Sequence, residues 1–277
     1  MSYKTLLVQL ELGRSNAAPI GVARSLASRL DLAVSGVGCA QPIQSIVGDA
    51  AFSSVLVRQD SASLKADAEA AQQEFRAGLE GNEDRLAWSF FVADRPLSEQ
   101  IAKVSGFADL VVVGIDQRAG EFSNYSRRVD IGDLLMQAGR PLLLVPLVIE
   151  HFNFRCAVVA WKDTREARRA LTDALPLLAS MDRIIVAEIG YAALESEVKA
   201  GLDRVVAWLG RHDIAAVPHF LPADGDESDQ LMTLAEESGA ELIVAGAYGH
   251  SRFREWVLGG VTHDLLHEAR CCLFLSH

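Results

Sequence analysis

The sequence predicts an α/β protein built from two tandem doubly wound domains, each with a five-stranded parallel sheet. Three observations lead to this fold class. Short apolar runs alternate with longer segments in which apolar residues recur every three or four positions, as expected for buried strands and amphipathic helices. The same order of elements occurs twice along the chain. The strict alternation of strands and helices favours parallel pairing with right-handed crossovers.

The first unit covers residues 1–148 and contains five expected strands. These strands are the apolar runs Thr5–Leu10, Leu32–Gly38, Leu86–Val92, Leu110–Gly114 and Leu142–Val145. Helical stripes of apolar residues lie between them at 20–30, 64–79 and 97–104, and a Leu-Leu helix lies at 132–135. The strands are nearly continuous apolar runs, which is typical of strands that are covered on both faces.

The second unit covers residues 154–277 and repeats this order. Its expected strands lie at 156–161, 184–189, 214–220, 242–245 and 272–275, and its expected helices at 167–178, 194–209, around Leu231 and Leu234, and at 261–268. The repeat is clearest where ADLVVVG in the first unit matches AELIVAG in the second. The join between the units is short, so we expect the units to pack on each other rather than swing freely.

Composition and charge exclude several classes of protein. The net charge is −11, from 26 Lys and Arg against 37 Asp and Glu, which argues against a nucleic-acid partner and against docking on an anionic membrane. No apolar run approaches the ~20 residues of a membrane span, and the polar N-terminal stretch does not read as a signal peptide. The 4 Cys form no CxxC motif, which indicates buried thiols in a reducing compartment. We therefore expect a cytoplasmic protein.

A polar loop after the fourth strand of the second unit carries the most informative pattern. The loop runs from Gly246 to Thr262, follows an expected strand and leads into an expected helix. Gly246 and Gly249 allow tight turns and a close approach of the backbone to a ligand. Gly259 and Gly260 place unobstructed N–H groups before a helix, where the helix dipole favours an anion, and Thr262 adds a hydroxyl donor or a helix cap. The loop is therefore a candidate phosphate cradle, and the alternative is a flexible connection with glycine turns.

The spacing of this loop resembles a known nucleotide-binding pattern. Gly246, Gly249 and Gly259 have the spacing G-x2-G-x9-G after the strand AELIVAG, and Val261-Thr262 opens the next helix. These features resemble the nucleotide-binding loop of the universal stress protein family. The doubled unit resembles the tandem members of that family, and the resemblance covers nearly the whole chain. It implies an adenine nucleotide alpha hydrolase-like fold, ATP or AMP binding in some cytoplasmic members, a role in the stress response and no established catalysis.

The resemblance implies a nucleotide site in the second unit. Its candidate residues come from the end of the first strand and from the glycine loop: Ala160, Lys162, Asp163, Gly246, Gly249, His250, Gly259, Gly260, Val261 and Thr262. The ligand would be ATP or AMP, with Mg²⁺ only as the companion of ATP. The pattern departs at two positions, because Gly260 stands where the family has Ser or Thr and Lys162 where it has Asp. Lys162 would instead offer a positive charge to a phosphate.

The first unit lacks the corresponding pattern. The position of the second glycine after Gly114 holds Gln117. Four nearby acids would repel a phosphate: Asp116, Glu121, Asp130 and Asp133. We therefore expect that this unit has lost the site and that its Gly132-Asp133 helix start is purely structural.

The leading interpretation is a tandem universal stress protein that acts as a regulatory binding protein and not as an enzyme. One alternative is a slow nucleotide-hydrolysing or nucleotide-transferring enzyme, for which Asp163 and His250 are the candidate groups. Another is a protein-interaction scaffold in which both sites are degenerate. In related single-domain proteins the fifth strand commonly mediates dimerisation, so the resemblance implies an intrachain pseudo-dimer through Leu142–Val145 and Cys272–Leu275. A homodimer of the whole chain is a further expectation.

Overall fold

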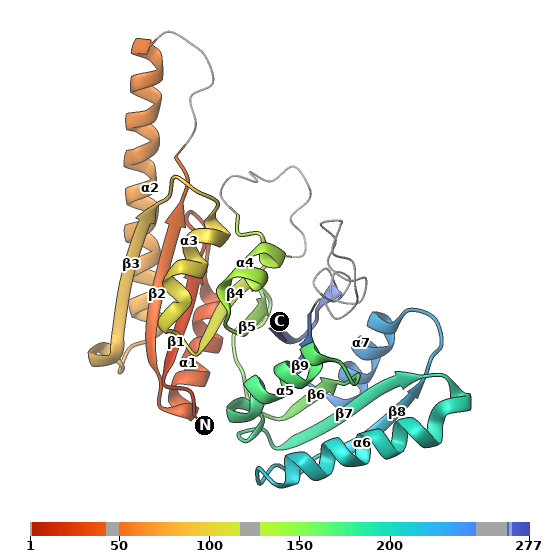
Figure 1. Ribbon diagram of the computed structural model, residues 1–277. Coiled ribbons are helices and arrows are strands. Elements are labelled where there is room, and N and C mark those ends of the chain that lie inside the picture. Colours follow the sequence, from red (N-terminus) through yellow and green to blue (C-terminus); the bar gives the residue numbers. More distant parts are fainter. Residues whose placement is uncertain (1, 43–49, 117–127, 248–264, 266–267) are drawn as a thin grey trace.

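The computed structural model describes residues 2–42, 50–116, 128–247, 265 and 268–277, with the backbone alone at 50–58 (Figure 1). In the first half the strands are β1 (Thr5–Leu10), β2 (Ala33–Ala40), β3 (Leu86–Val92), β4 (Leu110–Ile115) and β5 (Leu142–Pro146). The helices are α1 (Ala17–Leu30), α2 (Ala50–Gly78), α3 (Leu97–Val104) and α4 (Ile131–Ala138). Short 3₁₀ turns at Glu83–Arg85 and Ser105–Phe107 precede β3 and β4.

The second half repeats the alternation of strands and helices. Its strands are β6 (Cys156–Ala160), β7 (Arg183–Gly190), β8 (Val217–Pro222), β9 (Leu242–Gly246) and β10 (Cys272–Ser276). Its helices are α5 (Arg165–Leu178), α6 (Glu195–Gly210) and α7 (Glu227–Ser238), with a 3₁₀ turn at Ala192–Leu194 before α6. The helix expected at 261–268 falls almost entirely outside the described residues. Among the described helices, none has both the length and the apolar character needed to cross a membrane.

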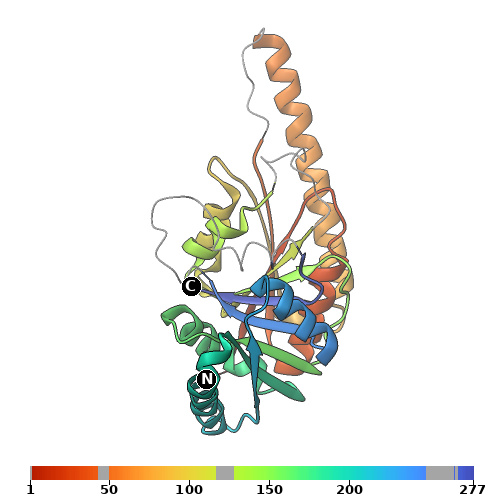
Figure 2. The ribbon, with the colours of Figure 1, turned by 90° about the vertical axis from the view of Figure 1, so that its right-hand side faces the viewer.

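The ten strands form one sheet in the order β3-β2-β1-β4-β5-β10-β9-β6-β7-β8. Each half therefore contributes five parallel strands in the same internal order, which confirms the α/β fold class. The halves meet where β5 and β10 pair antiparallel, with Leu143 opposite Phe274 and Leu144 opposite Leu273. The two predicted units are thus joined into one continuous sheet, through the strands expected to be counterparts (Figure 2).

Helices cover both faces of this sheet. Buried side chains of α1, α2, α5 and α6 pack on one face, and they form a single core that runs through both halves. Side chains of α3, α4 and α7, together with Leu265, pack on the other face. The central strands are covered on both sides, which is the physical reason for their continuous apolar sequences.

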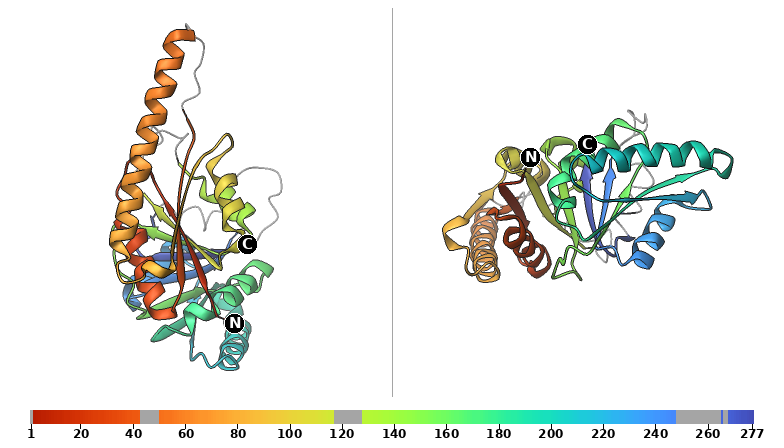
Figure 3. Two further views of the ribbon diagram at one scale, coloured as in Figure 1. Left: turned by 90° about the vertical axis from the view of Figure 1, so that its left-hand side faces the viewer. Right: turned by 90° about the horizontal axis from the view of Figure 1, so that it is seen from below.

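Two elements differ from the expected boundaries. The third strand of the second half begins at Val217 and not at Ile214. Ile214 is apolar because it is buried beside the end of α6, where its N–H donates to the carbonyl of Leu209. α2 begins at Ala50, well before the predicted stripe at 64–79. At 1.5 Å per residue its 29 residues span about 43 Å, and its first part projects beyond the body of the molecule (Figure 3).

The join between the halves is packed against both of them. Phe152 and Phe154 are buried with their rings in an edge-to-face contact at 4.8 Å, and the guanidinium of Arg29 lies 5.7 Å from the centre of the Phe154 ring. The backbone N–H groups of Asn153 and Arg155 donate to the Glu241 carboxylate at 3.0–3.2 Å. α1 also packs directly on the backbone of the join. These contacts fix the halves relative to each other.

Candidate functional site

The carboxyl edge of β6 and β9 is the switch point of the second half. The two strands are neighbours, with Ala160 opposite Ala245, while the chain leaves them toward opposite sides of the half-sheet. Ligands of doubly wound folds bind at such an edge. The structure brings four predicted site residues to it: Ala160, Lys162, Asp163 and Gly246. The other six lie outside the described residues: Gly249, His250, Gly259, Gly260, Val261 and Thr262.

The first turn of α5 forms one wall of this edge. Thr164 has an extended backbone, and its hydroxyl oxygen accepts a hydrogen bond from the Ala167 N–H at 3.2 Å, so it is the N-cap of the helix. The Thr164 N–H in turn donates to the carbonyl of Lys162 at 2.6 Å. The short β6–α5 connection is therefore tightly folded and holds Lys162 and Asp163 beside the helix start.

Gly246 meets a different steric requirement from the one predicted. We expected it to permit a tight turn, but it is the last residue of β9 and is not among the residues with positive φ. A Cβ at this position would lie 2.5 Å from the backbone nitrogen of Ala167 and 2.5 Å from the carbonyl carbon of Glu166. The glycine is therefore needed because the end of β9 packs directly on the backbone of α5. That contact places the start of the candidate loop against the helix N-terminus.

The charges after β6 have distinct environments. The Asp163 carboxylate is exposed and accepts hydrogen bonds from the Arg168 guanidinium at 2.6–2.8 Å. Lys162 is exposed and lies near Glu188 at the end of β7, where its charge acts to lower the pKa of that carboxyl. Lys162 forms no ion pair with another residue in the part of the chain that the structure describes, so its ammonium group can approach a bound anion.

Glu166 is a residue of this edge that sequence reasoning missed. It lies in the first turn of α5, is 8% exposed, and accepts a hydrogen bond from Arg165 Nε at 3.0 Å. Burial acts to raise its pKa, but hydrogen bonds and the charges of Arg165 and His277 outweigh this and hold the pKa below its usual value. His277 also contacts the carbonyl of Ala247 at 3.2 Å. The sequence signal was an acid in the first helical turn, which normally indicates only dipole compensation.

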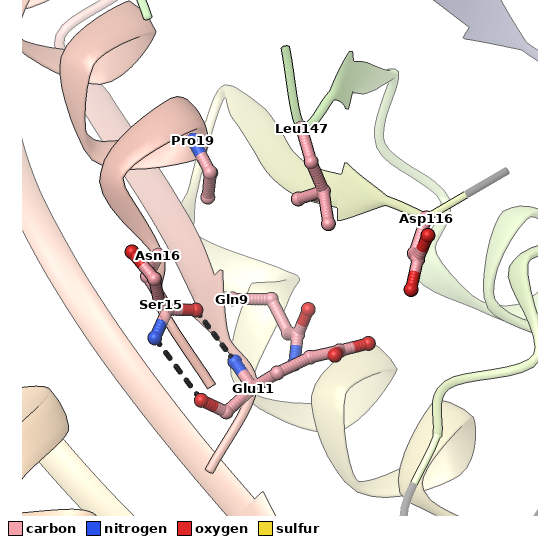
Figure 4. A pocket seen from close by; sticks show the side chains of 8 residues that line it. Gln9, Glu11, Ser15, Asn16, Pro19, Asp116 and Leu147 are labelled. Atoms are coloured by element: carbon pink, nitrogen blue, oxygen red, sulfur yellow. Dashed lines mark hydrogen bonds between the residues drawn. The ribbon is translucent and has the colours of Figure 1, made fainter. Parts of the chain in front are cut away.

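The equivalent edge of the first half forms a small crevice (Figure 4). Its walls come from the ends of β1 and β4 and from the start of α1, and its volume of about 10 Å³ is roughly that of one water molecule. Asn16 closes the β1–α1 loop, because its side chain accepts from the Glu11 N–H at 2.8 Å and donates to the Glu11 carbonyl at 3.0 Å. Figure 4 shows Pro19 and Leu147 on the upper side of this crevice, with Glu11 below them and Asp116 to the right.

Ion pairs occupy the mouth of this crevice. Arg14 lies 2.7 Å from Asp116 and 3.7 Å from Glu11, and Arg128 lies 3.4 Å from Asp116 and 3.8 Å from Glu11. We expected Asp116 to repel phosphate, and the structure places it in a cluster of two acids and two arginines. The first half has thus filled its switch point with its own side chains.

The other acids expected to repel phosphate in the first half have local structural roles. Asp130 is the N-cap of α4 and accepts from the Asp133 N–H at 2.8 Å. Asp133 accepts hydrogen bonds from the hydroxyl of Ser98 and from the Gln137 amide. Glu121 lies outside the described residues. Asp130 and Asp133 therefore hold the start of α4, in line with the expected structural helix start, and their repulsion of a phosphate stays a prediction.

The cysteines and the acidic side chains of the described residues form no reactive-thiol site and no metal site. All four cysteines are buried and free, and burial raises the pKa of Cys39 and of Cys271 to about 12. Within the described ranges, no group of three or more His, Cys, Asp or Glu side chains is arranged to hold a metal ion.

Comparison with known proteins gives the following matches. Residues 154–275 match the model of the universal stress protein family. A universal stress protein from Archaeoglobus fulgidus DSM 4304 has a TM-score of 0.74 at 14% identity, over 100% of this chain and 99% of that chain. A functionally unknown protein from Pseudomonas aeruginosa PAO1 has a TM-score of 0.62 at 13% identity, over 99% and 92%. At these identities the likeness shows the fold.

A universal stress protein from Archaeoglobus fulgidus, solved in complex with dAMP, covers 52% of this chain and 99% of its own, with a TM-score of 0.35 and 18% identity. A comparison with curated proteins gives no match.

Proposed function

Through its second half, residues 154–275, this chain belongs to the universal stress protein family, and on that premise we propose a binding function for it. The protein is a tandem universal stress protein that binds one adenine nucleotide, AMP or ATP, at the carboxyl edge of β6 and β9. It acts in the stress response as a regulatory protein of the cytoplasm. ATP brings Mg²⁺ with it, and we propose no resident metal site in the chain.

The position of Gly246 is the observation that carries this proposal. Gly246 ends β9 beside β6 and packs on the first turn of α5. It is also the first glycine of the G-x2-G-x9-G loop. The loop therefore starts at the switch point, next to a helix N-terminus whose dipole favours an anion. This supports phosphate binding in the second half.

The charges at this edge support modest affinity. Lys162 is exposed and offers a positive charge, whereas Glu166 places a buried carboxylate in the first turn of α5. Gly260 also lacks the hydroxyl that the family pattern supplies. We expect a dissociation constant in the micromolar range or weaker, which corresponds to a binding free energy of about −8 kcal/mol or smaller in magnitude.

The filled crevice of the first half supports a single site per chain. Its volume of about 10 Å³ is far below the roughly 300 Å³ at which ligand pockets begin. Glu11 and Asp116 would also lie next to any phosphate that entered there. Nucleotide binding at this edge would need the four-residue ion-pair cluster to open.

Titration calorimetry with AMP, and with ATP in the presence of Mg²⁺, tests the proposal directly. We expect at most one site per chain, loss of binding in Gly259→Val, and weaker ATP binding in Lys162→Ala. Lys162 is exposed, so its replacement leaves the fold intact even if the glycine variant is unstable. Gly114→Ala is a control in the first half, because the atoms nearest to its new Cβ belong to the side chains of Leu147 and Pro19, at 3.3–3.4 Å.

Two outcomes would contradict the proposal. Two equal sites per chain would show that the first half also binds, and unchanged binding in a folded Gly259→Val protein would place the ligand elsewhere. One universal stress protein of Archaeoglobus fulgidus was solved with dAMP, so dAMP belongs among the first ligands titrated.

We also propose that the protein is not a proficient hydrolase. Asp163, one candidate base, is exposed, and its carboxylate pairs with the Arg168 guanidinium. ADP formation from added ATP should stay at the level of a buffer control. Enzyme-like turnover that disappears in Asp163→Asn or His250→Ala would overturn this.

A homodimer of the chain is a separate prediction, and light scattering of the purified protein tests it.

A further inference from the structure

A groove separates α5 from α6 on the outer face of the second half. α5 packs mainly over β9 and β10, whereas α6 packs over β7 and β8, so the two helices lie on either side of β6 (Figure 1). In the first half, by contrast, α1 and α2 pack on each other. The space between α5 and α6 measures about 650 Å³, within the range of about 300–1,000 Å³ that is typical of small-molecule sites.

The groove has an apolar lining with aromatic side chains at two places. Trp161 lies at the end of β6 and Trp208 in the last turns of α6, and both are partly exposed. Trp208 also contacts the ring of His212 at 4.5 Å between ring centres. Aliphatic side chains from both helices lie between them, namely Leu171, Leu194, Val198 and Val205. Leu194 is 49% exposed and adds apolar surface at the open side of the groove.

Five charged side chains line the same groove, and they are not equivalent. Asp163 and Arg168 pair with each other at the rim. Glu197 and Arg204 are exposed on α6. Glu188 differs because it is half-buried at the end of β7, on the face toward α5 and α6 that Ile184 and Val186 share.

The Glu188 carboxylate is poorly compensated. No hydrogen bond or ion pair joins it to another side chain in the described part of the chain. Burial raises its pKa above the usual value, the charge of Lys162 opposes this, and that of Asp163 adds to it. Burying a carboxylate without a partner is costly, and a cation placed beside it removes that cost. The faces of two indoles also attract a cation.

We propose that the α5–α6 groove is a second ligand site, which binds a small organic cation with a flat apolar body. The apolar body lies between Trp161 and Trp208, and its positive charge pairs with the Glu188 carboxylate. The groove opens on the α5–α6 face and adjoins the carboxyl edge of β6 and β9, with Asp163 at the rim of both. Its apolar lining and Glu188 lie outside the set of candidate nucleotide-site residues, so the proposal does not rest on nucleotide binding.

Fluorescence anisotropy with 9-aminoacridine tests this proposal on the full chain. The probe is a flat tricyclic cation, and anthracene-9-carboxylate is the matched anion of similar shape. We expect the cation to bind at least ten-fold more tightly than the anion. Glu188→Gln keeps the shape of the side chain and should weaken cation binding about ten-fold, and Trp208→Ala should weaken both probes.

The control variant is Glu237→Gln, on the exposed surface of α7. It changes the net charge by the same amount as Glu188→Gln. If the probe cation binds through Glu188 and not through general attraction to the acidic protein, Glu237→Gln should leave its affinity unchanged. Saturating AMP should not displace the probe. Equal binding of cation and anion, an equal effect of both glutamine variants, or competitive displacement by AMP would each overturn the proposal. So would a dimer that excludes the probe and dissociates in Trp208→Ala, because the occupant would then be a second copy.

Discussion

Gly21→Ala is the sharpest perturbation that the join between the halves offers. Gly21 lies in α1 of the first half, and a Cβ there would collide with the carbonyl oxygen of Glu150 and lie 3.0 Å from its carbonyl carbon. The neighbouring atoms belong to the backbone, so no side-chain rotation relieves the contact. Either α1 or the join between the halves must move.

Two opposing terms set the size of the effect. Inserting a methyl group into a packed interior costs about 1–3 kcal/mol, whereas Gly to Ala inside a helix gains about 1 kcal/mol. The difference is a net loss in the free energy of unfolding of about 0–2 kcal/mol, and the backbone obstacle places the expected loss toward the upper end of that range. An unfolding entropy of about 2.1 cal/mol/K per residue over 277 residues converts a loss of about 2 kcal/mol to a fall in Tm of about 3 °C.

Thermal unfolding followed by circular dichroism measures this shift. Gly210→Ala is the control, because Gly210 is also helical and a Cβ there meets nothing within 4 Å. The control should melt at the wild-type temperature or slightly above it. If Gly21→Ala melts as high as Gly210→Ala, the join is free to yield and the reasoning about its packing is wrong.

Three further predictions concern single residues. Burial acts to raise the pKa of Asp109, but hydrogen bonds from the N–H groups of Lys4 and Thr5 and from the Thr5 hydroxyl hold it below its usual value. Asp109→Asn should therefore lower urea stability at pH 7, and the difference from wild type should shrink as the pH falls below about 4; a constant difference would contradict this. Thr164→Ala removes the N-cap of α5 and should cost about 1 kcal/mol, measured by urea unfolding, whereas Thr164→Ser should cost little. Ellman's reagent should react slowly with the native protein and rapidly with four thiols after unfolding, because all four cysteines are buried; fast native labelling would contradict their placement.

The strands were predictable because of how the sheet is covered. Runs such as those of β6 and β9 are apolar at every position, since helices lie on both faces. Two predicted element boundaries were wrong. Ile214 is apolar because it is buried against the end of α6, and in the sequence it resembles the start of a strand. The first turns of α2 project from the body (Figure 3) and have no sheet beneath them, so no stripe marked them.

The position of Gly246 in the fold was predictable from the sequence, but its contacts were not. The glycine spacing pointed to the end of β9, and Gly246 does lie at the switch point. Its contact with the backbone of α5 depends on a helix that lies about eighty residues earlier in the sequence. The pairing of Asp116 with Arg14 likewise joins residues about a hundred positions apart. Long-range contacts of this kind leave no local pattern in the sequence.

The antiparallel seam between β5 and β10 has a consequence for how the two halves can change. In a symmetric dimer of separate chains every substitution appears in both partners at once, and dilution can separate them. Here the seam joins two parts of one polypeptide, so its formation does not depend on protein concentration. Each half can acquire its own residues, as Arg14 and Arg128 in one and the glycine loop in the other illustrate. Covalent linkage thus permits one half to specialise in binding while the other keeps the shared sheet intact.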